Sequence, residues 1–143
     1  MRADKRRFSM MNSLALSLLP DVWAICRFPP DAAIPAWALT GEFVSITRTA
    51  DELSIVCAQA HVPSDVQCDP DWRCFKIEGP LDLSLVGILA ALTAPLAQAG
   101  IGVFAVSTYD TDYLMIKAGN VDKAVAALSQ AGYRFKPFGL AQT

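Results

Sequence analysis

The sequence predicts an α+β fold made of two ferredoxin-like units, each with an antiparallel sheet and its helices on one face. The first observation is the element order βαββαβ across residues 72–135. The second is an internal repeat: written without gaps, FVSITRTADELSIVC (residues 43–57) lies over VFAVSTYDTDYLMIK (residues 103–117). Each copy is an apolar run, a turn rich in hydroxyls and carboxylates, and a second apolar run. One supersecondary unit is therefore used twice.

Composition supports a folded chain of this size. The 143 residues are enough for one ordinary domain or for two small ones that share a core. The chain is 53% hydrophobic and 18% charged, which excludes disorder. An apolar excess on a small chain also indicates buried subunit surface, and we expect a homodimer. The net charge of -2 gives no field that would attract nucleic acid.

The N-terminus has the outline of a signal peptide, with basic residues ahead of an apolar run. Against that interpretation, Asn12 and Ser13 interrupt the apolar part, and residues 14–19 form only a short run. No segment approaches the roughly 20 apolar residues of a membrane span. We therefore expect residues 1–12 to be a disordered basic lead-in of a cytoplasmic protein that contacts no membrane.

The predicted N-terminal unit, residues 13–66, is an abbreviated copy of the plan. Its expected elements are strands at 14–19, 22–28, 43–47 and 53–60, with a short helix at 34–39. The polar, turn-rich interval 64–71 is the expected joint between the halves.

The predicted C-terminal unit, residues 67–138, carries the full βαββαβ order, and residues 139–143 form a tail. Its expected elements are strands at 72–77, 103–107, 113–117 and 133–135, and helices at 83–99 and 121–131. Asp82 and Asn120 are the expected N-caps of these helices, and Gly100 fits the left-handed cap of the first. Two right-handed crossovers place both helices on one face of the sheet.

Cysteine and histidine content gives no metal or disulfide signal. The four cysteines, Cys26, Cys57, Cys68 and Cys74, contain no CxxC spacing, and His61 is the sole histidine. Cysteine inside an apolar run behaves as a small hydrophobe, so we expect reduced, structural thiols.

Enzyme motifs are also missing from the sequence. It has no Gly-rich phosphate loop, no GxSxG motif and no zinc-ligand spacing. A hydroxyl nucleophile needs a base, and His61 precedes Val62 and Pro63 at a strand end, as an edge histidine would. We therefore predict a non-catalytic protein without a cofactor.

The polar turn of the second repeat is the first candidate site. Asp110 and Asp112 are two residues apart, which on extended chain puts both side chains on one face. Such a pair could hold a hard cation, or one carboxylate could act as a base. The turn alone accounts for Asp110, whereas Asp112 fits either role. Ser107 and Thr108 add hydroxyls at the strand end.

The junction that enters the first long helix is the second candidate site. Gly79 brings backbone close to a ligand, and a helix that begins at Asp82 aims N–H groups at a small anion; the glycine could equally be a turn residue. In the split βαβ plan this loop can lie near the second strand of a neighbouring copy. In the first repeat, Arg48 could meet a ligand carboxylate, but an ion pair with Asp51 or Glu52 is the favoured interpretation.

Two phrases, ITRTADELSIVC and FKIEGPLDLSLVGILAALTAPLAQAGIGVFAVSTYDTDYLMIK, together with the βαββαβ order, resemble the ACT-domain family. They are most similar to its tandem-repeat branch, which includes small bacterial proteins and the eukaryotic CASTOR-type arginine sensors. The resemblance covers residues 14–135. It implies two ACT units side by side with continuous sheets, and a regulatory, amino-acid-binding role without catalysis.

The resemblance also implies where a ligand sits. In ACT proteins it commonly lies between units, at the loop after the first strand of one unit and the second strand of another. By position these are Gly79, Pro80, Leu81 and Asp82, with Ser107 and Thr108 opposite.

Asp110 and Asp112 complete the candidate set. Two other functions stay open: a structural or protein-interaction module without a ligand, and a small hydrolase or metal-dependent enzyme that uses the two aspartates.

Overall fold

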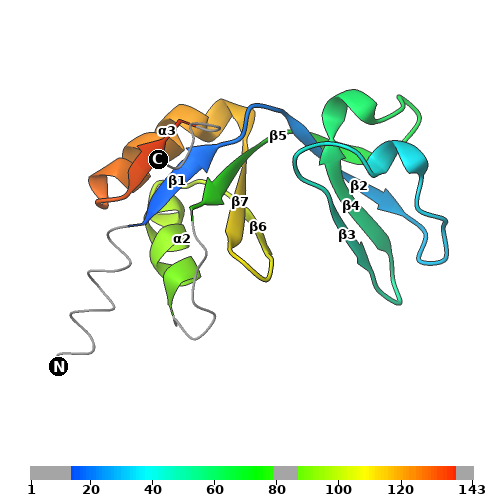
Figure 1. Ribbon diagram of the computed structural model, residues 1–143, viewed down its shortest axis with the longest axis horizontal. Helices are drawn as coiled ribbons and strands as arrows, with labels where there is room; N and C mark the ends of the chain where they lie inside the picture. The colour runs from blue at the N-terminus through cyan, green and yellow to red at the C-terminus, as the bar shows by residue number, and fades with distance from the viewer. Residues whose placement is uncertain (1–13, 79–86, 138–143) are drawn as a thin grey trace. The chain divides into compact units, whose positions relative to one another are not determined.

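The computed structural model describes residues 14–78 and 87–137, and the elements are labelled in Figure 1. The chain divides into two compact units. Unit 1 joins the residues before Asp21 to those after Arg73, and unit 2 is Asp21–Arg73. Within the described residues, no helix has the length and apolar character that crossing a membrane requires.

Unit 1 contains most of the regular structure. Its elements are β1 (Ala15–Leu18), the second half of β5 (Cys68–Ile77), α2 (Ile88–Gln98), β6 (Phe104–Ser107), β7 (Asp112–Lys117), the 3-10 turn η3 (Ala118–Asn120), α3 (Val121–Gln130) and β8 (Arg134–Lys136). Its strands follow the order β6-β7-β5-β1-β8. This is the predicted βαββαβ unit with one extra strand, β1, between the first and the last.

The placement of β1 differs from the sequence prediction, which put residues 14–19 in an N-terminal unit that ended at residue 66. In the structure β1 is antiparallel to β5, with Leu16 opposite Ile77, and parallel to β8. Leu16 is fully buried in the same core as Phe75 and Ile77. The short apolar run of residues 14–19 predicts a strand, but strand pairing between distant segments leaves no local pattern in the sequence.

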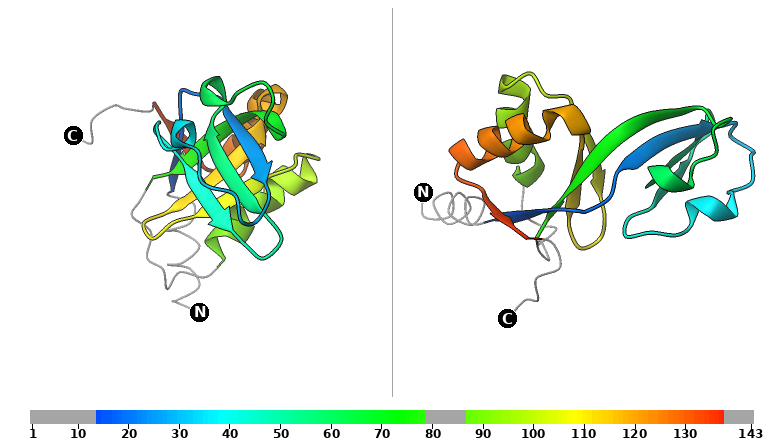
Figure 2. Two further views of the ribbon diagram at one scale, coloured as in Figure 1. Left: turned by 90° about the vertical axis from the view of Figure 1, so that its right-hand side faces the viewer. Right: turned by 90° about the horizontal axis from the view of Figure 1, so that it is seen from above.

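Both helices of unit 1 cover the same face of its sheet (Figure 2). In α2 the buried residues Ile88, Leu92 and Leu96 recur at helical spacing, and in α3 Ala124 and Leu128 do so. These helix residues pack against alternate residues of the strands. The fully buried strand residues of this core are Leu16, Phe75, Ile77, Leu114 and Ile116.

The helix ends of unit 1 were predicted only in part. Helix α2 begins at Ile88, with Gly87 as the N-cap residue, and the predicted N-cap Asp82 lies outside the described residues. Its C-terminal end is as predicted: Gly100 has a φ of 75°, and the N–H of Ile101 donates to the carbonyl of Leu96 at 2.9 Å. Asn120 occupies the predicted N-cap position of α3, but its side chain makes no capping hydrogen bond.

Unit 2 repeats the same plan with both helices shortened to single 3-10 turns. Its elements are β2 (Trp23–Phe28), η1 (Ala36–Ala38), β3 (Ser45–Arg48), β4 (Leu53–Ala58), η2 (Gln59–His61) and the first half of β5. The strand order is β3-β4-β2-β5, and neighbouring strands are antiparallel. The predicted abbreviated ferredoxin-like unit is therefore confirmed.

The core of unit 2 is small, as its short helices require. Its buried members are Ala24, Cys26, Ala38, Leu53, Ile55 and Cys57. The partly buried rings of Phe28 and Trp37 pack against it, with centroids 6.2 Å apart. The expected joint at residues 64–71 is shorter than predicted, because β5 begins at Cys68.

Candidate functional site

The turn between β6 and β7 closes on its own first residue. The N–H of Thr108 donates to the carbonyl of Thr111 at 2.8 Å, and the Thr108 hydroxyl donates to the same carbonyl at 3.0 Å. The N–H of Thr111 donates back to that hydroxyl oxygen at 3.4 Å. The threonine hydroxyl here supplies hydrogen bonds to backbone groups of the tight turn. The hydroxyl of Thr108 is thus engaged within the turn.

Ser107 and Asp112 face each other where the two strands meet the turn. They are register partners in the hairpin, and the Ser107 hydroxyl donates to a carboxylate oxygen of Asp112 at 2.5 Å. Asp110 lies inside the turn and is exposed. Among the described residues, no group of three or more histidine, cysteine, aspartate or glutamate side chains could hold a metal ion.

Thr111 ties this turn to the end of β5. Its side chain is only 4% exposed, and its hydroxyl donates to the carbonyl of Ile77 at 2.6 Å. The turn therefore lies where β5 ends and the chain continues toward residues 79–82. Those four candidates, Gly79, Pro80, Leu81 and Asp82, lie outside the described residues.

Thr111 is a site residue that the sequence analysis missed. It belongs to no strand, so hydrophobic periodicity gives it no signal. Its only mark in the sequence is its type and place: a β-branched hydroxyl residue between Asp110 and Asp112, just before β7.

Acidic groups gather around Tyr113 on β7. Burial raises the pKa of Tyr113 above the ordinary tyrosine value, and the nearby acidic groups of Cys74, Glu78 and Asp110 raise it further. Glu78 is itself held in place, because its carboxylate accepts a hydrogen bond from the buried hydroxyl of Ser17. This edge of unit 1 therefore offers carboxylate oxygens, which are suited to accept hydrogen bonds from an ammonium group.

Unit 2 contains the same turn, but its position differs by one residue from the one that the ungapped repeat predicts. The hairpin registers pair Arg48 with Leu53 and Ser107 with Asp112, so equivalent residues are 59 apart, as 48 and 107 are. The predicted alignment used an offset of 60. That offset is wrong, because a slip of one residue moves every strand side chain to the opposite face.

In the corrected register Thr49 corresponds to Thr108. The N–H of Thr49 donates to the carbonyl of Glu52 at 2.9 Å, and the N–H groups of Asp51 and Glu52 each donate to the Thr49 hydroxyl oxygen at 3.1 Å. The repeat thus preserves a turn that closes on the hydroxyl of its first threonine.

The residue before the turn is where the units diverge. Arg48 of unit 2 corresponds to Ser107 of unit 1, and its guanidinium donates to the carbonyls of Pro30 and, at 2.8 Å, Ala32. These acceptors belong to the loop after β2, the first strand of unit 2. The predicted ion pair of Arg48 with Asp51 or Glu52 is therefore replaced by hydrogen bonds to backbone.

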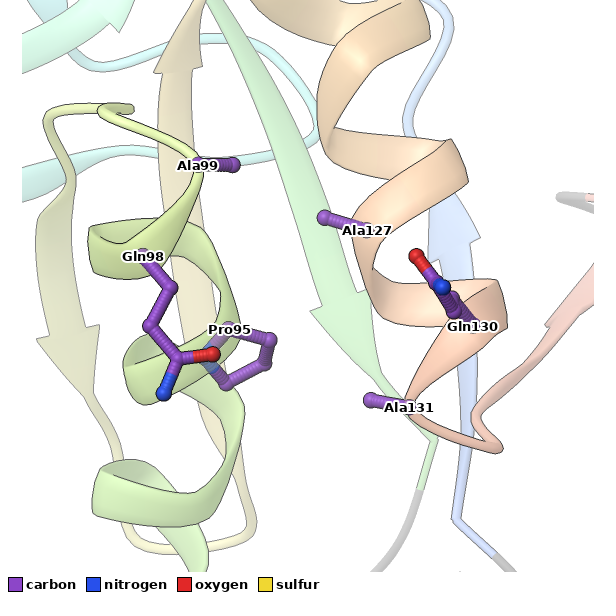
Figure 3. Close-up of a pocket in the computed structure, with 6 residues that line it drawn as sticks. All are labelled: Pro95, Gln98, Ala99, Ala127, Gln130 and Ala131. Atoms are coloured by element: carbon purple, nitrogen blue, oxygen red, sulfur yellow. The ribbon is translucent and has the colours of Figure 1, made fainter.

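A separate shallow groove lies between the C-terminal halves of α2 and α3 (Figure 3). Its volume is about 470 Å³, and its lining residues are Pro95, Gln98, Ala99, Ala127, Gln130 and Ala131. None of the predicted site residues lines it.

Two family models match the chain. The ACT-domain model matches residues 67–130, and a model of an N-terminal domain matches residues 21–65. Among curated proteins, the cytosolic arginine sensor for mTORC1 subunit 1 of Pongo abelii is 26% identical over 135 residues. That match covers 84% of this chain and 39% of the sensor, so the chain spans about two fifths of that relative's length.

Solved structures share the fold. The protein Atu0741 from Agrobacterium tumefaciens has 41% sequence identity and a TM-score of 0.84, with 92% of this chain and 98% of that chain covered. The regulatory subunit of aspartate kinase from Thermus thermophilus has 14% identity and a TM-score of 0.59, with 82% and 97% covered. At that low identity the second likeness shows the fold alone.

Proposed function

Because this chain belongs to the ACT-domain family, we propose that it is a non-catalytic regulatory protein that binds an amino acid or a similar small molecule. The observation that carries the proposal is the hydrogen bond from the Thr111 hydroxyl to the Ile77 carbonyl. It holds a turn rich in hydroxyls and carboxylates beside the end of β5, the first strand of the βαββαβ order.

The proposed ligand site is the one expected from the sequence. Asp110 and Asp112 accept hydrogen bonds from the α-ammonium group of the ligand, and Ser107 and Thr108 complete that side. Residues 79–82 (Gly79, Pro80, Leu81 and Asp82) provide the opposite side, as the ACT resemblance implies, and backbone N–H groups of this segment are the proposed donors to the ligand carboxylate.

The contrast with unit 2 supports unit 1 as the binding unit. In unit 2 the long side chain of Arg48 already occupies the space between its turn and the loop after β2. Ser107, its counterpart, is short and reaches only across its own hairpin to Asp112. Ser107 therefore does not reach beyond its hairpin as Arg48 does, and we propose that a ligand takes the corresponding place in unit 1.

The proposal extends to a cytoplasmic homodimer. Among the described strands, β6 stands at the end of the unit 1 sheet beside β7, and a strand in that position can pair with a second copy of the chain. A ligand at the turn that follows β6 would then lie close to that second copy.

A thermal-shift screen of the full chain against the twenty amino acids tests the function. Arginine is the first ligand to try, because a curated relative is named an arginine sensor. A ligand present at a hundredfold excess over its Kd stabilises the folded chain by about 2.7 kcal/mol, which is readily seen as a higher Tm. A flat response to all twenty would contradict the proposal and favour the alternative, an interaction module without a ligand.

A pair of matched variants tests the site. Asp110→Asn should abolish the ligand-dependent shift, whereas Asp51→Asn, the same turn position in unit 2, should leave it intact. Both aspartates are exposed, so neither change should unfold the chain. A shift that survives both Asp110→Asn and Asp112→Asn would move the ligand elsewhere without removing the function.

A further inference from the structure

Three of the four cysteines lie on one face of the unit 2 sheet. Cys26 on β2 is the register partner of Cys68 on β5. On its other side Cys26 is opposite Ile55 of β4, two residues before Cys57. Side chains two apart on a strand share a face, so all three thiols point into the small core of unit 2. Cys57 and Cys68 both lie close enough to Cys26 to raise the pKa of its thiol.

The two neighbours of Cys26 differ in geometry. The N–H of Arg27 donates to the carbonyl of Gln67 at 3.1 Å, which makes these residues a hydrogen-bonded pair. The adjacent pair, Cys26 and Cys68, is then of the non-hydrogen-bonded kind, in which Cα atoms are about 4.5 Å apart. That separation is within the range of about 4.4–6.8 Å that disulfides need. Cys57 is a diagonal neighbour, and such residues are about 7–8 Å apart.

Access to the three thiols also differs. Cys26 is 1% exposed and Cys57 is 0% exposed, whereas Cys68 is partly exposed at the start of β5. Burial, together with the neighbouring thiols, raises the pKa of Cys26 to about 12. An oxidant from solvent therefore meets Cys68 first, and Cys26 stands behind it as the second thiol.

We propose that Cys26 and Cys68 form an oxidisable dithiol that closes to a disulfide when the chain meets a peroxide. In the first step the Cys68 thiolate attacks a peroxide oxygen and the O–O bond breaks, which gives a sulfenic acid and a hydroxide ion. That hydroxide takes up the proton that the Cys68 thiol had released, and one water results. In the second step the Cys26 sulfur attacks the sulfenic sulfur. The S–O bond breaks, and the departing hydroxide takes the Cys26 proton as a second water. Hydrogen peroxide is reduced by two electrons, and the thiol pair is oxidised by two.

The disulfide would join the first strand of unit 2 to its last. The bond would enclose residues 26–68, most of unit 2, and so would restrict the unfolded chain. Because the enclosed loop is long, the oxidised protein should have a clearly higher Tm, by about 5 °C or more for a domain of this size. Oxidation would thus raise the stability of unit 2 without an added ligand.

Peptide mapping of the full chain after treatment with hydrogen peroxide identifies the bond. The remaining thiols are alkylated, and the chain is cut before aspartate. The cuts separate the three thiols into peptides 21–30 (Cys26), 51–64 (Cys57) and 65–68 (Cys68). A crosslinked pair of 21–30 with 65–68, lighter by two hydrogens than its parts, is the expected product. A bond to peptide 51–64, or oxidation of Cys68 to sulfinic acid alone, would overturn the assignment.

Three serine variants separate the dithiol from general thiol oxidation. Cys68→Ser should lose both the crosslink and the rise in Tm. Cys57→Ser should keep both, as should Cys74→Ser, which changes a buried cysteine of unit 1. Should any variant fail to fold, the peptide map of the wild-type chain still decides the question. An unchanged Tm in a wild-type chain that carries the crosslink would refute the stabilising role.

Discussion

The hairpin turns of units 1 and 2 share one design but differ in what holds them. Thr49 and Thr108 each close a four-residue turn with their hydroxyl oxygen, and an aspartate stands two residues later in both. In unit 2, two arginines reach the turn and its surroundings: Arg27 donates to the carbonyl of Asp51 at 3.2 Å, and Arg48 anchors the loop after β2. In unit 1, the anchor is the buried hydroxyl of Thr111.

This difference shows how a duplicated unit can keep its backbone while changing what it offers to other molecules. In unit 2 the side chain of Arg48 next to the turn uses its hydrogen-bond donors on the loop after β2. In unit 1 the buried hydroxyl of Thr111 holds the turn, and the carboxylate of Asp110 stays exposed to solvent. Under the proposed function, unit 2 is the structural copy and unit 1 is the binding copy.

The largest effects are expected in the two cores, at positions that correspond in the corrected register. Leu114→Ala and Ile55→Ala each remove a fully buried side chain from a central strand. Each should lower the free energy of unfolding by about 2–5 kcal/mol, as cavity-forming changes do. Chemical denaturation measures both. A much smaller loss for Ile55→Ala would show that unit 2 has no core comparable to that of unit 1.

The anchor of the unit 1 turn should come next. Thr111→Val keeps the side-chain shape but removes the donor to Ile77, leaving a buried carbonyl without its partner. The expected cost is about 1–3 kcal/mol of unfolding free energy. Glu52→Gln changes the corresponding position of unit 2 and should cost far less. Equal losses for the two variants would contradict the idea that a buried side-chain hydrogen bond holds the turn in unit 1 and not in unit 2.

The arginine of unit 2 should have a smaller effect. Arg48→Gln removes the guanidinium from the carbonyls of Pro30 and Ala32 in an exposed setting. We expect a loss of about 1 kcal/mol, because hydrogen bonds near solvent are partly replaced by water. Faster amide hydrogen exchange in residues 30–34 is the sharper readout. If exchange there stays as in the wild type, the arginine does not hold this loop.

The smallest effect is the alkaline pH dependence that Tyr113 adds to the stability of unit 1. Because the pKa of Tyr113 is higher in the folded chain than in the unfolded one, its contribution is complete below about pH 10. It is lost as the pH rises through the folded value. Tyr113→Phe should therefore flatten the fall of Tm above pH 10. Tyr109→Phe, at an 84% exposed position, is the control. Identical alkaline profiles for both variants would contradict this role of Tyr113.

Local patterns predicted the elements and the fold class well. Helical spacing of apolar residues identified α2 and α3, and Gly100 marked the end of α2 because only a left-handed residue continues the chain there. The repeat revealed that both halves use one plan. Its register was wrong by one residue, because both strands of each hairpin are apolar enough to match in either register.

Contacts between distant segments were beyond the sequence. The pairing of β1 with β8, the hydrogen bond of Thr111 to Ile77, and the thiol pair Cys26–Cys68 each join residues far apart in the chain. No local propensity distinguishes a strand that pairs within its own half from one that pairs with the other. The residue types of the acidic turn predicted it from the sequence, whereas the hydrogen bond that anchors the turn is visible only in the structure.

The position of β1 within the sheet of unit 1 has a consequence for biosynthesis. This strand is translated before unit 2, yet its partner residues in β5 and β8 are translated only after the whole of unit 2. Unit 2 can thus complete its own sheet before β1 finds either of its partners. Translation of β8, rather than of β1, then sets when the sheet of unit 1 closes.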